Sequence, residues 1–106
     1  MVADLLRIAA KPEWIWFHVP NGELRNKAVA GRLKAMGVKA GVSDILLMSP
    51  GGARLHALEL KREGEKPNDD QKAFLAKVSF MGGSSAWCDN FDKAVEILKH
   101  WGAVKL

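Results

Sequence analysis

The sequence has 106 residues, a net charge of +4 at neutral pH, 48% hydrophobic residues and 26% charged residues. That length and balance fit one ordinary globular domain over 1–106 and exclude a chain that is disordered throughout. The single cysteine, Cys88, excludes an internal disulfide and fits a reducing compartment. No apolar run approaches the roughly 18 residues of a membrane span, and the N-terminus lacks a signal-peptide pattern. We therefore expect a cytoplasmic protein without membrane contact.

The apolar periodicity and the turn residues predict helices and strands that alternate along the chain. In chain order they are a helix over 3–10, a strand over 14–19, a helix over 23–36, a hairpin with strands near 44–49 and 54–61, a helix from the cap at Asn68 to Gly82, a strand over 84–88 and a last helix that Asp89 or Asn90 caps and Gly102 ends. This order predicts an α/β domain with a mixed sheet covered by helices.

The segment 23–41 is both amphipathic and basic. Its inward-facing residues are predicted to be Leu24, Ala28, Leu33 and Met36. Its basic residues, set against the single acid Glu23, are Arg25, Lys27, Arg32, Lys34 and Lys39. These cations are candidates for contacts with backbone phosphates, which position nucleic acid without reading its sequence. A solvated helix face remains the alternative.

The hairpin has a register that brings charged residues together. With Gly51-Gly52 at its turn, Asp44 faces Glu59 across the two strands, and alternation puts Lys61 on the same side. A four-residue turn keeps this register, whereas a slip by one residue destroys it.

Apolar residues fill both faces of the hairpin, which predicts two central strands covered on both sides. Two carboxylates at such a place repel each other and lose solvent, so something must compensate them. Lys61 would offset one charge as an ion pair at the sheet rim, and a divalent cation would offset both. The residues alone leave these two explanations open.

The motifs GVSD, which ends at Asp44, and LELK, which holds Glu59 and Lys61, resemble the active-site signature of PD-(D/E)XK nucleases. Longer stretches are similar to the virus-type replication-repair nuclease (VRR-NUC) branch, which occurs as a standalone domain in phages and bacteria. These stretches are WFHVPNG, AGRLKAMGVKAGVSD, LELKREGEKPNDDQKAF and AVEILKHWG. The resemblance runs from about Trp14 to Gly102. It implies a restriction-endonuclease-like core, with a mixed central sheet flanked by helices.

The resemblance also implies a metal-dependent DNA endonuclease. Asp44 and Glu59 would bind Mg²⁺ or Mn²⁺, with the backbone carbonyl of Leu60 as a further ligand. Lys61 would orient or activate the attacking water, or stabilise charge on the phosphate. Gln71 matches the glutamine that follows the signature and would point towards the carboxylates. Its spacing from Asn68 also fits a helix capping box, which is the alternative role.

The chain departs from the family pattern at two places. Ser43 stands where the family has a proline before the aspartate, which should have little effect. The family also carries an acidic residue, usually Glu, early in its first helix, and the one acid there in this chain is Asp4. Three explanations of this difference stay open: the first helix is truncated at the N-terminus, Asp4 substitutes for the family's acidic residue, or this chain binds the metal more weakly than its relatives do.

The substrate and the partners follow from the same resemblance. It implies DNA repair on branched DNA such as a Holliday junction, in a bacterial or phage-infected cell, by a homodimer whose two-fold symmetry suits a junction. A DNA-binding module with a degenerate site is the alternative, and Mg²⁺-dependent nicking separates the two. His18 and Asn21, within HVPNG, are expected near the site. The four tryptophans are expected in the core or an interface rather than as base-stacking platforms.

Overall fold

The computed structural model describes residues 1–20 and 27–106. Its helices and strands follow the predicted order. They are α1 (Val2–Ala9), β1 (Ile15–His18), α2 (Lys27–Ala35), β2 (Ile45–Ser49), β3 (Arg54–Leu60), α3 (Asp69–Phe80), β4 (Ser84–Cys88) and α4 (Phe91–Trp101). The sheet has the order β1-β2-β3-β4, with antiparallel pairing from β1 to β3 and parallel pairing between β3 and β4. The predicted α/β fold with a mixed sheet is therefore confirmed.

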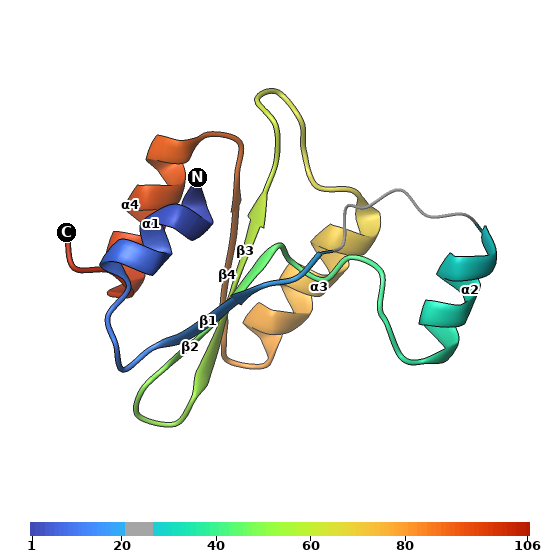
Figure 1. The fold of residues 1–106 in the computed structure, drawn as a ribbon, viewed down its shortest axis with the longest axis horizontal. Helices are drawn as coiled ribbons and strands as arrows, with labels where there is room; N and C mark the ends of the chain where they lie inside the picture. The colour runs from blue at the N-terminus through green and yellow to red at the C-terminus, as the bar shows by residue number, and fades with distance from the viewer. Residues whose placement is uncertain (21–26) are drawn as a thin grey trace.

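Helices cover both faces of the sheet, with α1 and α4 on one side and α3 on the other (Figure 1). The larger core lies beneath α1 and α4 and includes Leu6, Ile45, Leu47, Leu58 and Leu98. The smaller core lies beneath α3 and is formed by Ala57, Leu75 and Val78, with Leu46, Leu55 and Phe74 packed against it. The hairpin strands β2 and β3 contribute alternate residues to both cores, as expected for central strands.

The register of the hairpin is the predicted one. Ile45 pairs with Leu58 and Ser49 pairs with Arg54. The turn spans four residues, 50–53, rather than the two glycines alone. Gly51, Gly52 and Ala53 all have positive φ angles there. The longer turn preserves the register because both strands shorten by the same number of residues.

The predicted inward face of α2 is wrong. No residue of α2 is buried, Ala28 is exposed, Leu33 is only half-buried and Met36 is 77% exposed. Figure 1 shows α2 lying apart from the sheet, beyond α3, and no residue of this helix is buried by the part of the chain that the structure describes. The expected start of this helix at residue 23, and Leu24 with it, lie outside the described residues.

The tryptophans divide into two groups. Trp14, Trp16 and Trp101 pack against the larger core. The rings of Trp14 and Trp101 lie 4.8 Å and 5.1 Å from the buried His56 ring, centroid to centroid. Trp87 belongs to neither core and is 40% exposed, so of the two predicted places, core or interface, only the interface remains open for this residue.

None of the helices in the described segments is long and apolar enough to cross a membrane.

Candidate active site

Asp44 and Glu59 lie side by side at one end of the central strands. Asp44 immediately precedes β2, and its backbone carbonyl accepts a hydrogen bond of 2.8 Å from the amide of Val19, which follows β1. Its carboxylate oxygen Oδ2 accepts a hydrogen bond of 2.8 Å from the backbone amide of Leu60. The main chain of β3 therefore holds the Asp44 carboxylate towards Glu59. Both side chains lie on the α3 face, since Ala57 in the smaller core is two residues before Glu59.

The Glu59 carboxyl group is buried and incompletely bonded. Its side chain is 2% exposed, and Oε2 has no hydrogen-bond partner. Burial, hydrogen bonding with Asp44 and the Asp44 charge raise the pKa of Glu59 to about 8, while the Lys61 charge opposes this rise. At neutral pH the metal-free pair therefore retains one proton. A bound cation would displace that proton and supply the missing partner of Oε2.

Lys61 lies near the pair without forming an ion pair. Its charge lowers the pKa of Glu59, but less than Asp44 and burial raise it. Within the described parts of the chain, the ion pairs involve other residues and none joins Lys61 to a carboxylate. The simple explanation of the hairpin charges as a rim ion pair is therefore weakened. The predicted pairing of Asp44 with Glu59 is confirmed, and the charge of Lys61 acts on Glu59. The face on which the Lys61 side chain lies, and the roles of all three residues, remain predictions.

The donor set fits a hard divalent cation better than a zinc ion. In the described residues, no group of three or more His, Cys, Asp or Glu side chains gathers as a metal cluster. Two carboxylates remain, with the Leu60 carbonyl directly after Glu59 on β3 as the predicted third oxygen. Mg²⁺ accepts one or two carboxylates and completes its shell with water and substrate oxygens. The unpartnered Oε2 of Glu59 is the structural feature that fits such an ion.

Asp4 does not join the carboxylate pair. It lies on α1, which packs on the larger core, on the opposite face of the sheet from Asp44 and Glu59. Its carboxylate pairs with Arg7 at 2.9 Å and with the amino group of Met1 at 3.7 Å, and it is largely exposed. Substitution by Asp4 for the family's first-helix acid therefore has no support from this arrangement.

Gln71 caps helix α3. The backbone N–H of Asn68 donates a hydrogen bond of 2.9 Å to the side-chain oxygen Oε1 of Gln71. The backbone N–H of Gln71 in turn donates a hydrogen bond of 2.9 Å to the side-chain oxygen Oδ1 of Asn68. This is the predicted capping box, with both bonds present. The capping role is confirmed, and the side-chain amide nitrogen makes no hydrogen bond within the described residues. That nitrogen is the group left for the predicted role towards the carboxylates.

His18 contacts the main chain of the site rather than its carboxylates. The exposed His18 ring places Nδ1 2.9 Å from the backbone carbonyl oxygen of Asp44. It is thus close to the site, as expected, through a backbone contact. Asn21, expected nearby, lies outside the described residues.

Gly41 is a site-forming residue that the sequence analysis missed. Its φ angle is +83°, and a Cβ atom there would overlap the backbone carbonyl of Asp70 in the first turn of α3. The loop that leads to Asp44 therefore lies directly on the helix that Gln71 caps. The sequence does show a glycine three residues before Asp44. It does not show the reason for that glycine, because Gly41 contacts Asp70, which lies in a helix much further along the chain.

The basic candidates lie on an excursion of the chain that begins and ends beside Asp44, and their role remains a prediction. Lys27, Arg32 and Lys34 are exposed on α2, and Lys39 is exposed in the loop that follows. Arg25 lies outside the described residues. The chain leaves the sheet after Val19 and returns at Asp44, and these two residues are hydrogen-bonded to each other. The basic segment is therefore attached to the rim of the candidate site.

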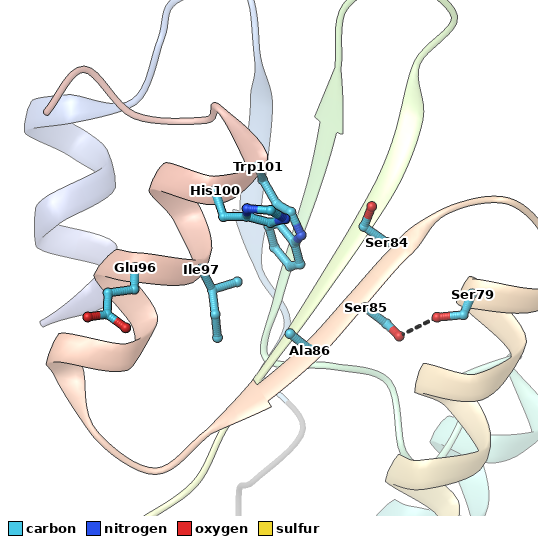
Figure 2. Close-up of a pocket in the computed structure, with 8 residues that line it drawn as sticks. All are labelled: Ser79, Ser84, Ser85, Ala86, Glu96, Ile97, His100 and Trp101. Carbon is cyan, nitrogen blue, oxygen red and sulfur yellow. Dashed lines mark hydrogen bonds between the residues drawn. The ribbon is translucent and has the colours of Figure 1, made fainter.

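A separate pocket of about 530 Å³ lies between α3 and α4 along β4 (Figure 2). Its lining residues are Ser79, Ser84, Ser85, Ala86, Glu96, Ile97, His100 and Trp101. Figure 2 shows the Ser79 and Ser85 hydroxyls pointing at each other, 2.7 Å apart. None of the predicted site residues lines this pocket, so its chemistry is distinct from that of the carboxylate pair.

Comparisons with known proteins address the fold. No family model matches the sequence, and no curated protein matches it. A solved structure described as a VRR_NUC domain protein is similar over 86% of this chain and 75% of its own, with a TM-score of 0.68 and 21% sequence identity. At that identity the similarity concerns the fold. The resemblance inferred from the sequence is therefore confirmed at the level of the fold, which this chain shares with that VRR_NUC domain protein.

Proposed function

We propose that the protein is a metal-dependent DNA endonuclease that hydrolyses phosphodiester bonds at Asp44 and Glu59. The observation that carries this proposal is the pair of carboxylates on central strands, with Glu59 buried and its Oε2 unpartnered. Such a pair is unfavourable in a protein without a compensating charge. The fold shared with a VRR_NUC domain protein supports a nuclease as the function for which this pair is retained.

Each residue of the site would have a separate role in hydrolysis. Asp44, Glu59 and the Leu60 carbonyl would hold Mg²⁺ or Mn²⁺, which when bound activates water and offsets charge on the reacting phosphate. The Leu60 amide keeps the Asp44 carboxylate in place. Lys61, whose charge is felt at Glu59, would stabilise the phosphate or orient the water. The free amide nitrogen of Gln71 would donate a hydrogen bond at the same site.

The basic segment would hold the DNA backbone. Lys27, Arg32, Lys34 and Lys39 are exposed around α2, and Arg25 is proposed to act with them. Contacts of this kind supply affinity without sequence preference, so the substrate would be selected by its shape. We therefore propose branched DNA, such as a four-way junction, as the substrate class.

A homodimer would suit a two-fold symmetric junction. The edge strand β1 supports a second copy as partner, because it exposes apolar side chains. Ile15 is 59% exposed and Phe17 is 43% exposed, and both lie on one face of β1. An apolar edge strand is a ready site for association between chains.

A cleavage assay tests the proposal. Labelled linear duplex, flap and four-way DNA would be incubated with the protein, with and without Mg²⁺, beside Asp44→Asn and Glu59→Gln. The control is Glu63→Gln, which removes an exposed carboxylate from the loop after β3. We expect Mg²⁺-dependent cleavage of branched DNA by the parent and the control only. Binding without cleavage by every protein would instead establish the DNA-binding module with a degenerate site.

A further inference from the structure

Trp87 differs from the other tryptophans in its surroundings. Trp14, Trp16 and Trp101 pack against the larger core, whereas Trp87 is 40% exposed and belongs to neither core. A single exposed apolar side chain needs no special explanation by itself. The neighbour of Trp87 in the sheet makes its exposure informative.

Trp87 is paired with Glu59. β4 runs parallel to β3, and Trp87 is the register partner of Glu59. Residues paired in this way point to the same face, about 4.8 Å apart across the strands. The hydroxyl of Ser85, two residues before Trp87, bonds to Ser79 of α3, which independently assigns these alternate β4 residues to the α3 face. The indole therefore stands beside the buried carboxylate pair.

The position of β4 leaves the indole accessible from outside. Among the described residues β4 is an edge strand of the sheet, with no strand paired beyond it. The indole thus presents an aromatic surface at the open side of Glu59, while the basic segment is attached at the opposite side, next to Asp44. A strand whose phosphate reached the carboxylates would bring the adjoining base to the indole.

We propose that Trp87 stacks on a nucleobase next to the phosphate held at Asp44 and Glu59, and so selects bases that have an exposed face, as at a branch point. This inference rests on the proposed function, which it deepens by naming what the site recognises in branched DNA. In an intact duplex each base is already stacked on both faces, so an indole gains a stacking partner only where a base is exposed. Stacking on an aromatic side chain tolerates any base, which agrees with recognition by structure rather than by sequence.

Metal-free binding gives the first test, because it does not require cleavage. Fluorescence anisotropy would compare single-stranded and duplex oligonucleotides on the parent protein, Trp87→Ala, Trp87→Leu and Trp87→Phe. We expect Ala and Leu to weaken single-strand binding roughly tenfold and Phe to retain most of it, with duplex binding unchanged. Phe80→Ala is the matched control, since Phe80 is an exposed aromatic at the far end of α3 from Gln71. Trp87→Leu keeps an apolar side chain but removes the aromatic ring, so weaker binding by this variant indicates lost stacking on a base rather than lost packing within the protein.

A double-mutant comparison then locates the base. Abasic sites would be moved one position at a time along the labelled strand. For the parent, removal of the stacked base should weaken binding about as much as Trp87→Ala does; for Trp87→Ala, the same abasic site should have no further effect. Independent, additive losses would overturn the proposal.

The remaining outcomes are also decisive. Equal binding by all Trp87 variants, or equal weakening on single-stranded and duplex DNA, would overturn the selection of exposed bases. Weakened binding accompanied by loss of the dimer in light scattering would assign Trp87 to the interface and overturn the proposal too. If the parent fails to cleave with Mg²⁺ while the base-dependent binding holds, hydrolysis is refuted and the stacking stands.

Discussion

Glu59→Gln should change how the stability of the metal-free protein depends on pH. The pKa of Glu59 is raised from 4.5 to about 8, so the folded state binds this proton more tightly than the unfolded state does. The resulting stabilisation is complete below pH 4.5 and is lost as the pH rises through about 8. Glutamine has the same shape as the protonated acid and no proton to lose, so its contribution stays constant.

The magnitude follows from the size of the shift. One pKa unit corresponds to about 1.4 kcal/mol, so the free energy of unfolding of the parent, relative to Glu59→Gln, should fall by about 3–5 kcal/mol between pH 5 and pH 9. Urea unfolding in EDTA, followed by circular dichroism at each pH, would measure it. Titration of groups that do not interact with Glu59, including the buried His56, cancels in the difference between the two proteins.

Mg²⁺ supplies the complementary measurement. At pH 8 to 9 it should stabilise the parent, because binding to the folded state alone raises stability, and it should stabilise Glu59→Gln much less. Glu63→Gln, whose carboxylate is exposed, should follow the parent throughout. A parent and a Glu59→Gln variant with the same pH dependence would show that the carboxylate pair is not a strained site, and the case for a metal there would fail.

Three further expectations concern other parts of the molecule. Arg32→Ala and Lys34→Ala should each weaken DNA binding on every sequence. Each should also reduce the slope of the logarithm of the binding constant against the logarithm of the salt concentration by about 0.9, as measured by anisotropy across a salt series. An unchanged slope would place α2 away from the DNA. Gly41→Ala should lower the free energy of unfolding by about 1–3 kcal/mol in urea. Gly31→Ala, on α2 with open space around it, should leave that free energy unchanged or raise it. Equal effects of the two substitutions would contradict the close contact between Gly41 and Asp70. The parent should be a dimer by light scattering and Phe17→Glu a monomer, and a monomeric parent would remove the homodimer from the proposed function.

The order of helices and strands along the chain and the register of Asp44 and Glu59 were predictable from the sequence. The glycine turn fixes the pairing of the two strands, and a four-residue turn centred on Gly51 and Gly52 keeps the register predicted for a two-residue turn. The capping box at Asn68 and Gln71 was equally local. Only the structure shows what capping means for Gln71: the side-chain oxygen is occupied by the capping bond, and the side-chain nitrogen is left without a hydrogen bond among the described residues.

What escaped prediction depends on segments that meet in space. The apolar spacing around Leu33 and Met36 indicates a helix but cannot show that no layer covers it. Alternation gives the face of Trp87 but not its place on an edge strand next to Glu59. Gly41 reads as an ordinary loop glycine until α3 is placed against it. In each case the missing information was the identity of the neighbour.

The hydrogen bond between Val19 and Asp44 has a consequence for how such a domain can diversify. It joins the two ends of the excursion that carries α2, so the sheet is closed beneath that excursion whatever it contains. The entropy of closing a loop rises only slowly with its length. A longer, shorter or differently charged insert at this point would therefore change the surface beside the carboxylates while leaving Asp44 and Glu59 in register.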